Sequence, residues 1–282
     1  MDRTAIIIQA RLGSSRLPNK VLRNLGGVAI LGWIIRRLRQ CSQIDEIVVA
    51  TSISPKDDPI ELFCRDHACL CFRGSEEDVL ERFLGAAHWV KADYVVRITS
   101  DCPLIEPEIV DRMASFFLAS KLDYAGCVHE RSFPRGLDAE IVRVASLLRV
   151  SRFDLEMRHR EHVTPYIYEN PNEFKIEAFS AEGEWHRNDI RLCVDNSMDL
   201  ETLEEIINNI NWTTVEGVSV QEVIHYADLR PDLLSRMAAT ELEHNQKNLS
   251  EGVQHTIRTR DLKHPAMENL TQTVAEPGRF FE

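Results

Sequence analysis

Short apolar runs alternate with amphipathic patterns over the first two hundred residues of the chain. A near-continuous apolar run over 5–10 predicts a strand that is buried on both faces of a parallel sheet. One apolar face, formed by Ile30, Ile34 and Leu38, predicts a helix. The alternation continues with predicted strands over 46–51, 69–72 and 93–98 and predicted helices over 57–68 and 78–92. We therefore expect an α/β fold with a Rossmann-like, mainly parallel sheet flanked by helices.

The pattern becomes less regular after about residue 123. The elements predicted there are strands over 123–127, 138–142, 174–179 and 190–194 and helices over 145–157 and 198–210. The half-exposed strand over 174–179 is typical of a small arm or subdomain, which we place at about 123–189. Beyond residue 228 the chain turns polar. We expect residues 1–228 to form the main domain and 229–282 a C-terminal appendage, packed on the surface or partly disordered.

Composition narrows the class of protein. No run approaches the roughly 18 consecutive apolar residues of a membrane helix, and Met1-Asp2-Arg3 leads directly into a strand-like run without a signal-peptide pattern. We therefore expect a cytoplasmic protein that does not insert into membranes. The net charge of −12 argues against a nucleic-acid partner, because such binding needs a basic surface. A polyanionic ligand would need a local cluster of cations.

The seven cysteines are scattered without a C-x-x-C pair. An odd, dispersed set of this kind is typical of reduced and mostly buried thiols. No pairing of cysteine with histidine has the spacing of a zinc site.

The first candidate site is the loop over 9–20, which joins the first strand to the helix that follows. Gly13, Ser14 and Ser15 allow a close approach of the backbone and offer amide donors, as in phosphate-binding loops. Arg11, Arg16 and Lys20 add three cations. The loop matches neither the Walker pattern nor the dinucleotide fingerprint, and a solvated basic turn remains the alternative. It lies where ligands bind in open α/β sheets.

Two acids follow apolar strands and could face the same loop. Asp101 stands where the strand over 93–98 opens into a proline-containing loop, and Asp195 ends the run over 190–194. Their carboxylates could hold Mg²⁺ for phosphoryl or nucleotidyl transfer. The alternatives are a helix or turn cap for Asp101 and an N-cap for Asp195.

An ordered series of motifs resembles the SpsF-type cytidylyltransferases, which are relatives of the sialic-acid and 3-deoxy-manno-octulosonate cytidylyltransferases. The resemblance covers roughly residues 4–210. The motifs that carry it are Gln9-Ala-Arg-Leu-Gly-Ser-Ser-Arg-Leu-Pro-Asn-Lys, Val49-Ala-Thr-Ser, Arg73-Gly-Ser-Glu-Glu-Asp-Val-Leu-Glu-Arg, Arg97-Ile-Thr-Ser-Asp-Cys-Pro-Leu-Ile, Pro134-Arg-Gly-Leu-Asp-Ala-Glu, Arg160-Glu-His-Val-Thr-Pro-Tyr and Val194-Asp.

The resemblance implies a nucleotidyltransferase that joins CMP from CTP to a small anionic acceptor, such as a sugar acid, and releases pyrophosphate in surface polysaccharide or glycan synthesis. It also implies a homodimer and Mg²⁺ held by Asp101 and Asp195. The implied site residues are Arg11, Gly13, Ser14, Arg16 and Lys20 on the triphosphate, Ala10, Arg73 and Ser75 near cytosine, and Arg135, Asp138, Glu140 and His162 on the acceptor side. His162 could assist removal of a proton, or could be a packing residue; Glu140 could contact the acceptor, or could be an exposed strand residue.

Two positions depart from the family's pattern. Its usual glycines are replaced by Asn19 before Lys20 and by Ser100 before Asp101. Asparagine tolerates a left-handed conformation. Serine would be strained at a position of positive φ, and would narrow the site if the nucleotide needs that space. Two other functions remain open: a nucleotide-sugar glycosyltransferase, although Asp101 lacks the first acid of an Asp-x-Asp motif, and a nucleotide-binding protein without activity.

Overall fold

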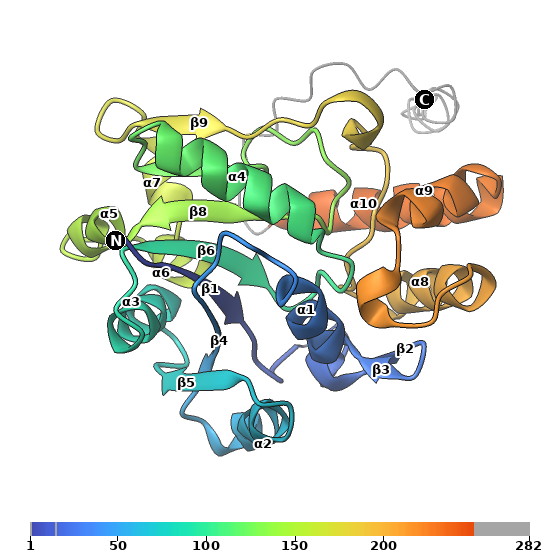
Figure 1. Cartoon of the computed structure of the whole chain (residues 1–282), viewed down its shortest axis with the longest axis horizontal. Coiled ribbons are helices and arrows are strands. Elements are labelled where there is room, and N and C mark those ends of the chain that lie inside the picture. The colour runs from blue at the N-terminus through green and yellow to red at the C-terminus, as the bar shows by residue number, and fades with distance from the viewer. Residues whose placement is uncertain (1, 15, 251–282) are drawn as a thin grey trace, which may run out of the picture.

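A seven-stranded sheet forms the centre of the computed structural model, which describes residues 2–14 and 16–250 (Figure 1). The strand order is β5-β4-β1-β6-β8-β7-β9. The strands are β1 (Thr4–Gln9), β4 (Glu46–Ser52), β5 (Leu70–Gly74), β6 (Tyr94–Thr99), β7 (Tyr124–Gly126), β8 (Glu140–Arg143) and β9 (Ile176–Ala178). Within this sheet only β8 runs against its neighbours, so the prediction of a mainly parallel sheet is confirmed.

Helices cover both faces of the sheet because alternate residues of its central strands point to opposite sides. Ile6 and Ile8 of β1 face one apolar core, and Ala5 and Ile7 face the other. The first core is shared with α1 (Ile30–Leu38), α2 (Asp58–Asp66) and α4 (Pro107–Ala119). The second is shared with α3 (Val79–Trp89), α5 (Val144–Val150) and α7 (Pro165–Glu169). Strands enclosed in this way read as continuous apolar runs in the sequence.

The register of the sheet gathers three loops at one edge. Gln9, the last residue of β1, pairs with Ala50 of β4 on one side and with Thr99 of β6 on the other. The carboxyl ends of these three parallel strands therefore lie side by side. The loops that follow them contain the basic segment, the short 3₁₀ helix η2 (Pro55–Asp57) and Asp101.

Three elements differ from those expected. Helix α4 was not predicted, although Ile109, Met113 and Phe117 recur at helical spacing. The helix expected over 145–157 ends at Val150, and α6 (Met157–His162) is separate; Phe153 in the connection packs on the core and extended the apolar pattern. The strand expected over 190–194 is wrong: the segment is buried, but its pairing is an isolated β-bridge between Arg135 and Arg191 and not a strand of the sheet.

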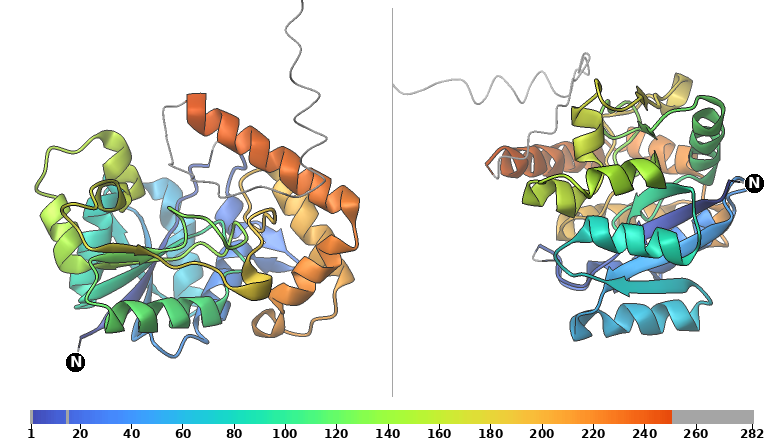
Figure 2. Two further views of the ribbon diagram at one scale, coloured as in Figure 1. Left: turned by 90° about the horizontal axis from the view of Figure 1, so that it is seen from above. Right: turned by 90° about the vertical axis from the view of Figure 1, so that its left-hand side faces the viewer.

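Residues 196–250 form a group of helices beside the sheet. These are α8 (Ser197–Asn209), α9 (Val220–Asp228) and α10 (Pro231–Ser250), with the 3₁₀ turn η4 (Val215–Gly217) between the first two. Figure 2 shows α10 lying along α8 and α9. Leu233 and Met237 of α10 are buried in the first core. The fold thus continues past residue 228, and residues 251–282 of the expected appendage lie outside the described residues.

Smaller elements complete the path of the chain. They are η1 (Lys20–Leu22), the hairpin strands β2 (Asn24–Leu25) and β3 (Val28–Ala29), and η3 (Gly183–Trp185). Among the described residues, no helix combines the length and the apolar character needed to cross a bilayer.

Gly136 fixes the close approach of the loop after β7 to the buried segment over 190–194. Its φ is +104°, and a Cβ there would lie 2.6 Å from the carbonyl carbon of Leu192 and 2.7 Å from the amide nitrogen of Cys193. We expect Gly136→Ala to lower the free energy of unfolding by about 3 kcal/mol or more, because both the backbone angle and the packing exclude a side chain. Urea unfolding followed by circular dichroism measures the loss.

Gly13→Ala is the matched control for stability. A Cβ on Gly13 meets nothing within 4 Å, and its φ is not positive. Its unfolding free energy should therefore stay within about 0.5 kcal/mol of the wild-type value. Equal losses in the two variants would contradict the packing assigned to Gly136.

Candidate active site

The loop after β1 is held in shape by bonds to its own residues and to η2. The amide of Ser14 donates to the carbonyl of Leu12 over 2.9 Å, and the Ser14 hydroxyl accepts from the amide of Leu17 over 3.3 Å. The amide of Leu12 donates to Oδ1 of Asp57 over 2.7 Å. Asp57 is buried and also accepts from Ser52, so the end of β4 fixes the start of the loop. Asp57 was predicted only as the start of a helix.

Asn19 turns the chain so that Lys20 points back toward the sheet. Its φ of 58° and ψ of 25° lie in the left-handed region, which asparagine adopts more readily than most residues. The expectation that Asn19 is a mild departure from glycine therefore fits the backbone. Ser100, the other departure, does not have a positive φ, so the strain considered for that position does not arise.

Lys20 joins the two acids that the sequence placed at strand ends. Its Nζ lies 3.2 Å from Oδ2 of Asp101 and 3.1 Å from Oδ1 of Asp195. Its third contact is the carbonyl of Val194 at 3.0 Å. An ammonium has three donors, so all of them have an oxygen partner. The side chain of Lys20 is only 13% exposed, which places this cluster in a partly desolvated site.

Backbone bonds bring the two acids together. The amide of Val194 donates to the carbonyl of Asp101 over 2.8 Å. The segment over 190–194 also exchanges two backbone bonds with Arg135. The segment expected to be a sheet strand thus bonds to loops instead, and in doing so it sets Asp195 beside Asp101.

The charges in this cluster reinforce one another. Burial alone would lower the pKa of Lys20, but the two carboxylates raise it above its ordinary value. Burial would raise the pKa of Asp195, but Lys20, Arg16 and Arg191 together hold it well below the usual range. Burial and Asp195 would raise the pKa of Asp101, but Lys20 and a hydrogen bond with Thr99 together lower it below its ordinary value. All three groups are therefore ionised near neutral pH.

Asp195 is not the N-cap of the following helix. Asn196 caps α8, and its side chain and that of Asp199 form a reciprocal capping box. The Asp195 carboxylate instead accepts from Arg16 over 3.1 Å and from Arg191 over 2.9 Å. Nor does Asp101 cap α4, whose N-cap is Glu106. A helix-capping role is therefore excluded for both acids, although Asp101 does lie in a turn.

Arg191 is a site residue that the sequence did not single out. It is almost fully buried and contacts the carboxylates of Asp195, Asp199 and Glu241, at 2.9, 2.9 and 2.8 Å. Its position inside an apolar run hid it, because charged residues in such runs are read as exposed positions of a strand. Four residues separate it from Asp195, but the segment is not helical, so no helical spacing pointed to the pair.

The predicted cytosine side lies at the ends of β1, β4 and β5. Ala10 is buried, and its amide donates to the carbonyl of Ala50. The guanidinium of Arg73 donates to the carbonyls of Ser52 and Ser54, at 2.9 and 2.8 Å. The hydroxyl of Ser75 accepts from the amide of Asp78 over 3.0 Å. Arg73 and Ser75 thus brace the loops around this edge.

Arg82 of α3 is a further cation at this edge. It is 1% exposed, and one of its nitrogens donates to the carbonyl of Ser75. Its Nε and Nη2 have no hydrogen-bond partner within the described part of the chain. Burial, with a smaller contribution from nearby Arg11, lowers its pKa. Arg82 ends the motif over 73–82, where it was quoted without a role.

Helix α6 joins the predicted acceptor-side motif to the loop after β1. Glu161 accepts from Arg11 over 3.1 Å, and Arg160 pairs with Asp78 at the start of α3. His162 is the last residue of α6 and is half-buried. The buried histidine of this helix is His159, which lies 3.0 Å from Oε2 of Glu169. His162 therefore follows directly after Glu161, whose carboxylate contacts Arg11 of the loop after β1.

The other predicted acceptor-side residues are already paired. Asp138 pairs with Arg131. Glu140 is 2% exposed and accepts from Arg97, from Thr164 and, over 2.9 Å, from Tyr124, so the alternative of an exposed strand residue is wrong. Because its carboxylate is enclosed, an acceptor-side role for Glu140 would be indirect. Nε of Arg135 lies 2.7 Å from Oε2 of Glu241, without the alignment of a hydrogen bond.

Helix α10 reaches the cluster from the far end of the described chain. His244 lies 3.4 Å from Oδ2 of Asp195 and 3.4 Å from Nη1 of Arg16. Burial, and then Arg135, lower the pKa of His244 to about 4 even though Asp195 opposes the change. Nothing in the polar pattern beyond residue 228 marked Glu241 or His244 as neighbours of the first loop.

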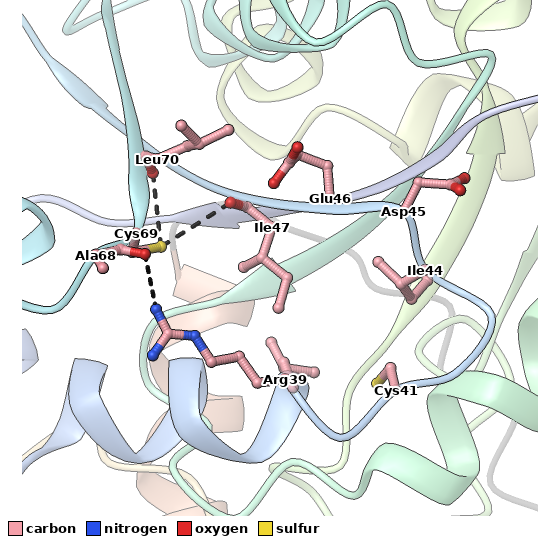
Figure 3. A pocket seen from close by; sticks show the side chains of 10 residues that line it. Arg39, Cys41, Ile44, Asp45, Glu46, Ile47, Ala68, Cys69 and Leu70 are labelled. Carbon is pink, nitrogen blue, oxygen red and sulfur yellow. Dashed lines mark hydrogen bonds between the residues drawn. The ribbon is translucent and has the colours of Figure 1, made fainter.

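Two pockets lie at opposite edges of the sheet. One of about 570 Å³ adjoins the first loop and is lined by Leu12, Gly13, Asn19, Leu22, Lys56 and Pro59. The other, of about 220 Å³, lies at the amino ends of β4 and β5, where Arg39 and Cys69 are bonded to neighbouring carbonyls (Figure 3). Only the first is at the edge that carries the acids and the cations.

Comparisons with known proteins show the family to which the chain belongs. A family model described as Cytidylyltransferase matches residues 5–227. The spore coat polysaccharide biosynthesis protein SpsF of Bacillus subtilis (strain 168) is 34% identical, covering 86% of this chain and 99% of that protein. A cytidylyltransferase structure from Leptospira borgpetersenii serovar Hardjo-bovis (strain JB197) superposes with a TM-score of 0.77 at 32% identity, covering 83% of this chain and 97% of that one.

A more distant structure supports the fold alone. CMP:2-keto-3-deoxy-manno-octonic acid synthetase, in complex with CTP, has a TM-score of 0.57 at 19% identity and covers 73% of this chain and 99% of its own. The nucleotidyltransferase type of sheet is thereby confirmed. The family match spans most of the sequence and includes the loop, Asp101 and Asp195. The chain belongs to the cytidylyltransferase family.

Proposed function

We propose that the protein is an Mg²⁺-dependent enzyme that transfers CMP from CTP to an anionic acceptor, such as a sugar acid, and releases pyrophosphate. The observation that carries the proposal is the Lys20 ammonium, which holds Asp101 and Asp195 together beside the cationic loop. The family model supports CTP as the donor. The name of the Bacillus subtilis relative supports a place in surface polysaccharide or glycan biosynthesis.

The triphosphate would lie over the loop after β1. Arg11, Arg16 and Lys20 supply positive charge, and the amides near Gly13 and Ser14 supply donors. Their present partners are carboxylates: Glu161, 42% exposed, pairs with Arg11, and Asp195, 8% exposed, pairs with Arg16. These carboxylates stand in for the anionic oxygens of a phosphate. Bound CTP would replace part of these contacts. The cations would then stabilise the leaving pyrophosphate.

Asp101 and Asp195 fit a magnesium ion. Mg²⁺ prefers oxygen ligands and is commonly held by one or two carboxylates together with substrate phosphates and water. Both carboxylates here are ionised and meet at one cation, Lys20, which shows that they can share a positive partner. A bound Mg²⁺ would neutralise charge on the phosphate oxygens during in-line displacement.

The cytosine and the acceptor would lie on either side of the proposed metal site. Backbone groups at Ala10, with Arg73 and Ser75 holding the surrounding loops, would contact cytosine, and Arg82 adds two donors there. Arg135 and Asp138 would face the acceptor. Glu140 is buried, so its contribution would be indirect. His162 would accept the proton of the attacking hydroxyl.

Release of pyrophosphate tests the function. The assay contains CTP, Mg²⁺ and a panel of 2-keto sugar acids, with ATP, GTP and UTP as control nucleotides. We expect release with CTP and at least one acceptor, and its loss when EDTA removes the metal. Binding of CTP without release on any acceptor would indicate a nucleotide-binding protein, and transfer from a nucleotide sugar would indicate a glycosyltransferase.

We also propose a homodimer. Strand β9 is one of the two edge strands of the sheet and is half-exposed, and an edge of this kind can pair with a second copy. Light scattering after size-exclusion chromatography would give about twice the mass of one chain, whereas a monomer at micromolar concentration would contradict the proposal. The predicted cytoplasmic location is part of the same proposal and is tested by cell fractionation.

A further inference from the structure

Helix α10 has two halves that are held in different ways. The first half is anchored by apolar contacts, because Leu233 and Met237 are buried and Thr240 is buried beside them. In the next turn Glu241 and His244 contact the rest of the fold through ion pairs, and Leu242 is 42% exposed. Polar contacts of this kind can be exchanged for a charged ligand at lower cost than buried apolar ones.

Glu241 lies between two arginines at the edge of the catalytic cluster. Its Oε2 is 2.7 Å from Arg135 and 2.8 Å from Arg191. Burial would raise the pKa of Glu241, but Arg135 and Arg191 lower it below its ordinary value, so the side chain is a carboxylate. Within the described part of the chain, Glu241 is the only carboxylate paired with Arg135. Arg191, in contrast, keeps Asp195 and Asp199 if Glu241 leaves.

The guanidinium of Arg191 fixes the position of the Glu241 carboxylate relative to the proposed metal site. Arg191 contacts Glu241 through Nη1 and Asp195 through Nη2. A carboxylate on Arg135 and Arg191 therefore sits one side chain away from Asp195 and Lys20. An acceptor that placed its carboxylate there would lie next to the proposed metal site and to the loop over which the nucleotide is proposed to bind.

We propose that Arg135 and Arg191 form the subsite for the acceptor's carboxylate, and that Glu241 of α10 occupies this subsite until an acceptor displaces it. The inference rests on the proposed function and goes beyond it, because it assigns a role to a helix that starts after the region matched by the family model. Glu241 then acts as a specificity filter: a neutral sugar cannot compete with it, whereas a sugar acid can.

Binding of a simple carboxylate tests the subsite. Pyruvate is the probe, and methyl pyruvate is its uncharged control, each titrated calorimetrically into the full chain. We expect Glu241→Gln to bind pyruvate roughly tenfold more tightly than wild type, because the competing charge is gone and the shape is kept. Glu243→Gln, which removes an exposed charge two residues away on the same helix, should bind like wild type. Adding Arg135→Gln to Glu241→Gln should abolish the gain.

Hydrogen exchange of the wild-type protein gives a second test that does not depend on any variant folding. Amides over 241–246 should exchange faster in saturating pyruvate and be unaffected by methyl pyruvate. Unchanged exchange, or equal pyruvate affinity in wild type and Glu241→Gln, would overturn the proposal. CTP titrated into the same samples separates this inference from the proposed function. If CTP binds normally but Glu241→Gln has no effect on pyruvate binding, only the role of α10 is wrong. If CTP does not bind, the proposed function is wrong.

Discussion

Replacing Asp101 with asparagine is expected to lower kcat for pyrophosphate release by a factor of roughly 10²–10³. The carboxylate is one of two that meet at Lys20, and the amide that replaces it is neutral and a much weaker ligand for Mg²⁺. The fold should survive, because Lys20 keeps Asp195 and the carbonyl of Val194. The measurement is pyrophosphate release with the acceptor identified by the panel, over a series of Mg²⁺ concentrations.

A matched variant separates the metal role from a general effect of charge. Asp154→Asn removes one negative charge at an exposed position between α5 and α6, and its rate should equal that of wild type. Asp101→Asn should also fail to recover at high Mg²⁺ concentration. If it kept wild-type turnover, the assignment of Asp101 to the metal would be wrong.

Lys20→Met is expected to cost both activity and stability. The change leaves two carboxylates side by side without the ammonium that binds both, and removal of one partner from a buried ionic group destabilises a protein by roughly 3–5 kcal/mol. Arg16 and Arg191 still contact Asp195, so the loss should fall at the low end of this range. Differential scanning fluorimetry would show a melting temperature several degrees below that of wild type.

The change in melting temperature on adding a divalent cation distinguishes the predicted role of Lys20 from a general loss of stability. In Lys20→Met a divalent cation should take the place of the ammonium, so Mg²⁺ or Mn²⁺ should raise the melting temperature more than in wild type. Lys175→Met, at an exposed position before β9, should show neither the loss nor the larger response. A variant as stable as wild type, or one insensitive to divalent cations, would show that Lys20 does not hold the two carboxylates together.

Much of the site was predictable because its parts lie at the ends of recognisable strands. The apolar run of β1 located the loop with Arg11, Arg16 and Lys20, and the run of β6 located Asp101. Adjacent parallel strands end at the same edge, so the meeting of Lys20 with Asp101 followed from the fold class. Asp195 was found by the same reasoning although its segment is not a strand, because buried extended chains and strands share an apolar pattern.

The parts that escaped prediction depend on contacts between distant segments. Arg191 is 50 residues from Glu241, and Arg16 is 228 residues from His244. No local pattern carries information about such pairs. Glu140 illustrates the same limit within the sheet: the sequence left open an acceptor contact or an exposed strand position, but its cross-strand neighbour on β6 is Arg97, and the pair is buried.

Calorimetric titration of CTP in the presence of Mg²⁺ tests the central claim most directly, because it needs no knowledge of the acceptor. The account predicts binding of CTP with a strong dependence on Mg²⁺, weaker binding of ATP, GTP and UTP, and loss of the Mg²⁺ dependence in Asp101→Asn. Absence of CTP binding at millimolar concentration, or binding that is the same with and without Mg²⁺, would contradict it.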